Sequence, residues 1–376
     1  MSIRLPIIRP TLPSIGSFTA KLKESYESGI VTLGRNVEAF EEEACRATGA
    51  EWAVAVGNCT SGLMLAYRAL GCKPGGEAIC PSFTFAATAH AILWNGLVPV
   101  FVDCLPGTYT IDPAQIQKAL SPRTVAICPV YVYGLPPDLE QVREVAQQAG
   151  VPVVSDSAQG LGATYKGAPA GTWADVEVFS LSPTKVITAI EGGLVVTNRP
   201  DLGYCLRSLR DYGKALDGPM ALEDMAEVGL SARMSELHAT VGVLSLADRE
   251  RLVAARLRLI QVYRDRLGKL PGCSVQRYPS DRTTSGNYFV LFISEAARRS
   301  RDKVYVALKR RGIQTKRYFY PPIHEQSAQK SRPMRIVGDL PNTVKASREA
   351  LALPLYSHMK AEEQEEVCQA VEDLLA

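Results

Sequence analysis

Histidine and paired cysteine are scarce in this sequence, and their scarcity limits its chemistry. The 376 residues include four dispersed histidines and nine cysteines, no two of which have the CxxC spacing. Zinc sites and disulfide frameworks need such clusters, so neither a metal enzyme nor a disulfide-stabilised secreted domain is indicated. The sequence therefore predicts a reduced, cytoplasmic protein that holds no metal.

A large excess of charge of one sign is also missing. Lys and Arg number 42 against 39 Asp and Glu, a net charge of +3, which argues against nucleic acid or an anionic membrane as the main partner. Residues 78–102 carry no charged side chain but contain Pro81, Asn95 and Gly96, so we expect buried strands and a helix there instead of a membrane span. Prolines near the N-terminus interrupt the apolar core that a signal peptide needs.

What is present is an alternation of strand and helix patterns, in a chain long enough for two domains. The predicted strands are 52–56, 78–80, 98–102, 124–127 and 152–155, and the predicted helices are 61–70, 86–94, 113–120 and 139–149. Strands that are apolar on both sides and alternate with helices predict an α/β domain with a mostly parallel sheet between helices. In such sheets the ligand binds beyond the carboxyl ends of the strands.

The pattern changes near residue 237. Residues 237–270 read as one long helical region, followed by a strand at 285–293 and helices at 302–311 and 361–375. We therefore predict a large domain over residues 1–240, and a connecting helix with a smaller α+β domain over residues 241–376.

The candidate chemistry lies between Val153 and Val196, in VVSDSAQGLGA and FSLSPTKVITAIEGGLVVT. One strand delivers Asp156, with Gln159 just beyond it, and a second delivers Ser180, followed by Lys185 in a short loop. A buried lysine amine has a lowered proton affinity and can form an imine with an aldehyde, and an aspartate can pair with a protonated pyridine nitrogen. On these residues alone, a buried Asp–Lys ion pair beside an ordinary turn is the alternative.

Two further loops contribute candidates. In GNCTSGLMLAYRAL a helix begins after Gly57–Asn58, and its first N–H groups near Thr60 can bind an anion, although a plain N-cap explains the same residues. In CPSFTFAATAHAILWNG, Phe85 follows a strand and is placed either to stack on a flat ring or to pack in the core.

These segments together resemble the DegT/DnrJ/StrS family of sugar-nucleotide aminotransferases. The resemblance runs almost end to end and includes GRNVEAFEEEACRATG, VYVYGLPPDLEQV, GLSARMSELHATVG, YFYPPIHEQ and LALPLYSHM besides the segments above. It implies the fold type I of pyridoxal-phosphate-dependent transferases, with a large domain built on a seven-stranded-type sheet, and pyridoxal 5′-phosphate as cofactor.

The resemblance also implies roles for individual residues. Lys185 matches the Schiff-base lysine, Asp156 the partner of the pyridine nitrogen, and Gln159 a residue near the phenolic oxygen. Residues that match the phosphate site are Thr60, Ser61 and Ser180. Phe85 matches the aromatic residue that covers one face of the cofactor ring. Tyr318 and His324 match a loop near the sugar.

Family members are homodimers with active sites at the interface, and the partner's G-x-N-x-R-M loop supplies an asparagine to the phosphate. Here Ser231 stands at that asparagine position, and Cys59 stands where the family usually has glycine. Both departures bear on how the phosphate is held.

The implied reaction transfers an amino group from L-glutamate, which becomes 2-oxoglutarate, to a keto-sugar nucleotide. Three alternatives stay open: a deoxysugar dehydratase of the same family, an aminocyclitol aminotransferase, and a non-catalytic regulatory relative. Because the family's 3-dehydratases have histidine at the lysine position, Lys185 favours amino transfer.

Overall fold

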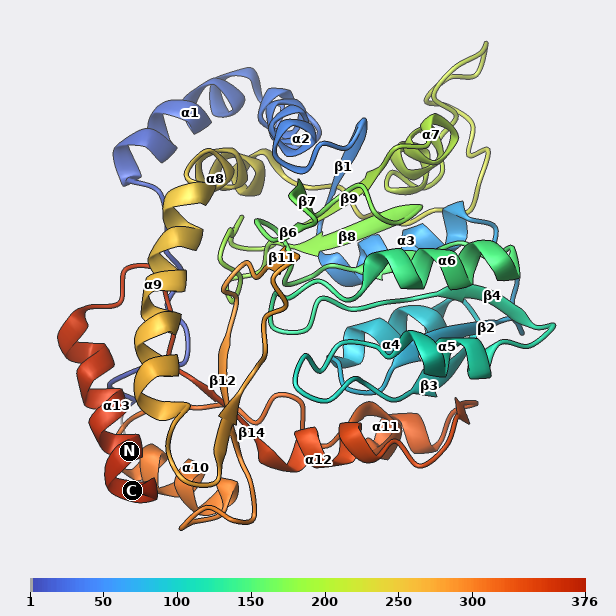
Figure 1. Cartoon of the computed structure of the whole chain (residues 1–376). Coiled ribbons are helices and arrows are strands. Elements are labelled where there is room, and N and C mark those ends of the chain that lie inside the picture. The colour runs from blue at the N-terminus through green and yellow to red at the C-terminus, as the bar shows by residue number, and fades with distance from the viewer. Residues whose placement is uncertain (1–2) are drawn as a thin grey trace.

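The principal feature of the computed structural model, which describes residues 3–376, is one large twisted sheet (Figure 1). Its two halves have the strand orders β13-β3-β2-β4 and β1-β9-β8-β5, and parallel bridges join Ile127 to Val153 and Val130 to Asp156. The strands are β1 (Trp52–Val56), β2 (Glu77–Pro81), β3 (Val98–Val102), β4 (Thr124–Ile127), β5 (Val154–Asp156), β8 (Val176–Ser180), β9 (Gly193–Thr197) and the short edge strand β13 (Arg335–Ile336). β9 runs antiparallel to both of its neighbours, whereas the other pairs formed by β2, β3, β4, β5, β8 and β13 are parallel. The predicted mostly parallel sheet is confirmed.

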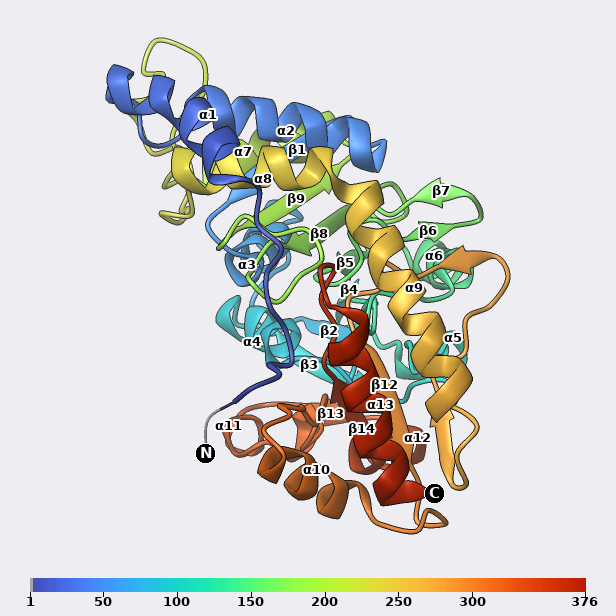
Figure 2. The ribbon, with the colours of Figure 1, turned by 90° about the vertical axis from the view of Figure 1, so that its left-hand side faces the viewer.

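Helices cover both faces of this sheet. In Figure 2, α3 and α4 lie on one side of the strands and α5 and α6 on the other. The helices around the sheet are α1 (Ile15–Ser28), α2 (Arg35–Thr48), α3 (Cys59–Ala69), α4 (Ala86–Trp94), α5 (Pro113–Ala119), α6 (Leu139–Ala149), α7 (Pro200–Leu209) and α8 (Glu236–Ala247). The uncharged residues 78–102 form β2, α4 and β3, as expected for buried structure, and no helix among residues 3–376 has the length and apolar character to cross a membrane.

A second, antiparallel sheet has the strand order β10-β12-β14 and packs against the helices of the C-terminal part. Its strands are β10 (Cys273–Val275), β12 (Phe289–Ile293) and β14 (Ala350–Leu353). The helices of this part are α9 (Arg249–Leu267), α10 (Arg301–Arg310), α11 (Ser327–Lys330), α12 (Pro341–Glu349) and α13 (Ala361–Leu375), with a 3₁₀ turn at Ile323–Glu325. A third, small sheet links the two parts of the chain, because β11 (Arg282–Thr283) of the C-terminal part pairs with β6 (Thr164–Tyr165). The strand β7 (Ala168–Pro169) pairs with β6 on its other side.

The structure corrects some predicted boundaries. The expected single helix over 237–270 is two helices, α8 and α9, because the backbone of Asp248 leaves the helical conformation between them. The strand expected over 285–293 begins only at Phe289, and the helix expected from Ser61 begins at Cys59.

The N-terminal segment lies against the C-terminal part of the chain. Leu5 forms a parallel bridge with Ile313, and the Gln314 N–H donates to the Leu5 carbonyl across 2.8 Å. The predicted division after residue 240 falls inside α8, and it stays a prediction.

Candidate active site

A cavity of about 380 Å³ opens beyond the carboxyl ends of the central strands. Asp156 and Gln159 reach it from the end of β5, and Ser180 and Lys185 from the end of β8 and the loop that follows. Other parts of its wall come from the ends of β1 and β4, the start of α4 and the C-terminal part of the chain. Parallel strands bring their carboxyl ends to one edge, so residues far apart in the sequence meet there.

Asp156 is a buried acid at the floor of this cavity, with an exposed fraction of 4%. Burial raises the pKa of its carboxyl, and the opposing effect comes first from Thr88 and then from the Ala158 N–H. Thr88 Oγ1 donates to Asp156 Oδ2 across 2.6 Å, and the Ala158 N–H donates to Oδ1 across 3.2 Å. The carboxyl is thereby fixed in orientation as well as in position.

Lys185 lines the same cavity and keeps part of its surface open to it. Burial lowers the pKa of the Lys185 amine, while the nearby Cys59 and Asp156 oppose this effect. A lowered pKa raises the fraction of neutral amine, which is the form that attacks a carbonyl. The structure thus brings the predicted amine and the predicted acid together.

An anion-binding turn forms the wall at the start of α3. Asn58 is the N-cap, and its Oδ1 accepts the Ser61 N–H across 2.8 Å. Asn58, Cys59 and Thr60 face the cavity, and the first N–H groups of a helix have no partner within it. The predicted Ser61 does not line the cavity, and its hydroxyl donates to the Asn58 carbonyl across 2.8 Å. Cys59 has helical geometry, so its replacement of glycine needs no positive φ.

The other predicted cofactor residues also line this cavity. Phe85 is the N-cap residue of α4 and has an exposed fraction of 57%, which leaves its ring free to cover a flat group. Ser180 ends β8. Gln159 is buried, and its Oε1 has no hydrogen-bond partner among the described residues, as expected for an atom that meets a ligand.

The two predicted substrate residues behave differently. Tyr318 lines the cavity, and burial raises its pKa to about 12. His324 does not line it; instead, its Nδ1 lies 2.7 Å from Ser82 Oγ, and burial lowers its pKa. A role for His324 beside the sugar stays a prediction.

Residues that the sequence analysis did not select include Thr88, Tyr131 and Tyr288. Thr88 lies three residues after Phe85 on α4, a spacing that puts both on neighbouring turns of one helix face. That spacing was the available signal for Thr88, whereas Tyr131 and Tyr288 come from unrelated segments and carry no local signature.

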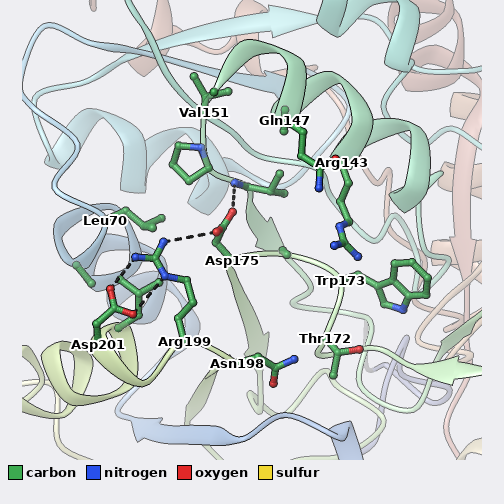
Figure 3. Close-up of a pocket in the computed structure, with 17 residues that line it drawn as sticks. Leu70, Arg143, Gln147, Val151, Thr172, Trp173, Asp175, Asn198, Arg199 and Asp201 are labelled. Atoms are coloured by element: carbon green, nitrogen blue, oxygen red, sulfur yellow. Dashed lines mark hydrogen bonds and ion pairs between the residues drawn. The ribbon is translucent and has the colours of Figure 1, made fainter.

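A second depression, of about 640 Å³, lies among the starts of β5 and β8 and the end of β9 (Figure 3). Arg199 pairs there with Asp175 and Asp201, and Arg143 lies over the Trp173 ring at 5.9 Å. Because the amino ends of β5 and β8 are at this edge, it is the opposite edge of the sheet from Lys185.

The residues of the first cavity fit pyridoxal phosphate. The first cavity is lined by five features that suit this cofactor: the amide oxygen of Gln159, unpaired among residues 3–376, the start of α3, the exposed ring of Phe85, the buried acid Asp156 and the Lys185 amine, whose pKa is lowered by burial. A single turn or ion pair would not require this combination.

Comparisons with known proteins cover nearly the whole chain. The family model described as the DegT/DnrJ/EryC1/StrS aminotransferase family matches residues 15–372. An Escherichia coli protein named dTDP-4-amino-4,6-dideoxy-D-glucose transaminase is 30% identical over 364 residues, which are 95% of each chain.

Solved structures agree in fold. The crystal structure of DesI in the presence of its TDP-sugar product has a TM-score of 0.91 at 34% identity, covering 99% of this chain and 93% of that one. The crystal structure of S. venezuelae DesV in complex with a ketimine intermediate has a TM-score of 0.86 at 31% identity, covering 97% of this chain and 98% of that one. The fold predicted from the sequence is confirmed.

Proposed function

We propose, from the premise that the chain belongs to the DegT/DnrJ/EryC1/StrS aminotransferase family, that it moves an amino group from L-glutamate to a keto-sugar nucleotide with pyridoxal phosphate as cofactor. The observation that carries this proposal is that Lys185 and Asp156 line one cavity. The names of the E. coli relative and of the DesI complex support a thymidine-diphosphate sugar as the substrate class.

The chain's own residues would divide the work. Pyridoxal phosphate, when bound, would supply an electron sink for the carbon that loses or gains a proton. Lys185 would hold the cofactor through its amine and, once released, carry the proton to and from that carbon. Asp156 would pair with the protonated pyridine nitrogen, and the Thr60 turn and Ser180 would hold the phosphate. Phe85 would cover one face of the cofactor ring, and Gln159 would lie near its phenolic oxygen.

An adjoining cavity of about 430 Å³ supports a nucleotide as part of the substrate. It shares Thr84, Phe85, Tyr318 and Phe319 with the first cavity. Lys316 lines it, is exposed, and forms no ion pair among the described residues, so its ammonium is free for an anion. The first cavity has room for the cofactor, and the second would take the diphosphate and base.

Exposed apolar side chains support a homodimer. Met220, Leu222, Met225 and Val228 lie in one segment, and their exposed fractions are at least 50%. Exposed apolar groups that gather on a surface are typical of an interface. Ser231 stands at the position where the resemblance implies a partner's asparagine, and it is also exposed. Arg233 Nη2 donates to Ser231 Oγ across 3.4 Å. We propose that the active site is completed across this interface.

The direct test separates the two halves of the reaction. The yellow protein prepared with pyridoxal phosphate should lose its visible absorbance when L-glutamate is added, with one equivalent of 2-oxoglutarate formed. Addition of dTDP-4-keto-6-deoxyglucose, the ketone that corresponds to the amine in the E. coli relative's name, should restore it. A yellow protein that responds to no amino donor would contradict the proposal and favour a regulatory relative. Loss of water from the sugar without consumption of donor would favour a dehydratase.

Lys316→Ala tests the second cavity. Losing an exposed charge-assisted contact should raise KM for the sugar nucleotide by about tenfold, while the half-reaction with glutamate stays unchanged. The matched control is Lys73→Ala, an exposed lysine before β2, on the edge of the sheet away from the cavity. An equal change in both half-reactions would contradict the assignment of the diphosphate to Lys316.

A further inference from the structure

A buried carboxyl group accepts a hydrogen bond from Tyr131, a residue of the cavity wall, without lining the cavity itself. Glu177 is the second residue of β8, between Val176 and Val178, and its exposed fraction is 0%. A buried carboxylate costs several kcal/mol unless it is paired or hydrogen-bonded. Such a group in an otherwise apolar strand therefore needs compensating partners.

The partners of Glu177 are hydrogen-bond donors from three different segments. The Trp173 backbone N–H donates to Glu177 Oε1 across 2.8 Å. Trp173 also forms part of the wall of the depression in Figure 3. The Ser157 hydroxyl and the Tyr131 hydroxyl donate to Oε2 across 2.9 and 3.2 Å. No Lys, Arg or His among residues 3–376 forms an ion pair with Glu177. Burial raises the pKa of Glu177, and hydrogen-bond donors, including the Gly171 backbone, oppose this effect.

Two of these donors flank the residues that the reaction needs. Ser157 directly follows Asp156, and the Tyr131 N–H donates to the Asp156 carbonyl across 3.1 Å. The Tyr131 ring also lies against Gly160, where an added Cβ would be 2.5 Å from the ring. Gly160 directly follows Gln159. Glu177 thus holds Ser157, which follows Asp156, and Tyr131, whose ring packs against Gly160 at the end of loop 156–160.

We infer that Glu177 is a positioning residue, which fixes loop 156–160 so that Asp156 and Gln159 face the cofactor. Asp156 is held from the α4 side by Thr88, and Glu177 acts through Ser157 and Tyr131 on the backbone that carries it. The inference rests on the proposed function, because it assigns Asp156 and Gln159 to the cofactor.

The experiment compares Glu177→Ala with Glu77→Ala. Glu77 is a matched control, because it is also fully buried in this sheet and is held by Ser121, Arg123 and Arg335, yet does not line the cavity. Hydrogen exchange of the peptide spanning residues 154–161 is measured on the cofactor-free proteins, and pyridoxal phosphate affinity by titration. Losing three hydrogen bonds to a charged group should speed exchange in that peptide by at least about tenfold and weaken binding by at least about fivefold in Glu177→Ala only.

Conservative variants keep the test decisive. Glu177→Gln retains an acceptor for the Trp173 N–H and should bring exchange back to within about threefold of the native protein. If Glu177→Ala does not fold, Ser157→Ala carries the test and should speed exchange in the same peptide by about threefold. Native-like exchange and affinity in Glu177→Ala, or equal changes in Glu77→Ala, would overturn the inference. A native protein that binds no pyridoxal phosphate would instead overturn the proposed function, while the exchange measurement would still decide on Glu177.

Discussion

Replacing Thr88 with valine tests whether Asp156 acts on the cofactor as an ion. Thr88 is fully buried, and its Oγ1 donates to Asp156 Oδ2 across 2.6 Å. Thr88→Val keeps the branched shape of the side chain and removes the donor. The carboxyl of the variant remains buried, with the Ala158 N–H as its other hydrogen-bond donor.

The magnitude follows from the charge of the acceptor. A hydrogen bond to an ionised group contributes about 1.5–3 kcal/mol and one to a neutral group about 0.5–1.5 kcal/mol, a difference of about 1–1.5 kcal/mol. The variant should therefore raise the Asp156 pKa beyond the rise that burial already causes. Below that pKa the carboxyl must lose its proton before it can pair with a protonated pyridine nitrogen. At pH values below the Asp156 pKa, the variant should bind the cofactor about tenfold more weakly than the native protein does. The ratio of the two dissociation constants should approach one as the pH rises above the Asp156 pKa of the variant.

The assay is a titration of the cofactor-free protein with pyridoxal phosphate at several pH values from about 5 to 9. Thr110→Val is the matched control, because Thr110 is equally buried and its hydroxyl bonds Thr108 at 3.1 Å away from the cavity. A dissociation-constant ratio that stays constant with pH, or equals that of the control, would refute the reasoning.

Three further outcomes are expected. Glu236→Ala should lower the free energy of unfolding by about 3 kcal/mol in urea titrations, because its carboxylate accepts three N–H groups at the start of α2, and Glu236→Gln should cost less. Gly193→Ala should abolish tight cofactor binding, since the new Cβ would lie 2.6–2.7 Å from the backbone of Asn58 and Cys59; native affinity would contradict this. Because burial lowers the Lys185 pKa, covalent capture of pyridoxal phosphate should reach half its maximal rate below the ordinary lysine pKa of about 10.4, and a midpoint at or above that value would contradict it.

Much of the large sheet could be predicted, because its strands are apolar on both faces and alternate with helices. Strands β1, β3 and β4 and helices α4 and α6 have the predicted bounds. The break at Asp248 could not be read from the pattern, since the apolar residues of α8 and α9 follow each other without a proline or glycine between them. The late start of β12 has a similar cause, because residues 285–288 are buried without being part of the ladder.

Some residues of the site could also be predicted from the strand pattern, and others could not. Asp156 and Ser180 could be predicted because each ends a strand, and Lys185 because it lies in the loop after one, and such strand ends meet at one edge of the sheet. For Thr88 the spacing from Phe85 was the available signal, whereas Glu177 had none, because its hydrogen bonds with Ser157 and Tyr131 join separate segments of the chain. His324 shows the converse, since a residue selected by its motif bonds Ser82 outside the cavity.

The central claim is that the Lys185 amine holds the cofactor opposite Asp156. The most direct measurement is borohydride reduction of the protein loaded with pyridoxal phosphate, followed by peptide mapping of the attached group. One residue, Lys185, should be modified. Lys185→Ala should form no stable adduct but should still bind the cofactor without a covalent bond. Attachment to another lysine, or an undiminished adduct in Lys185→Ala, would contradict it.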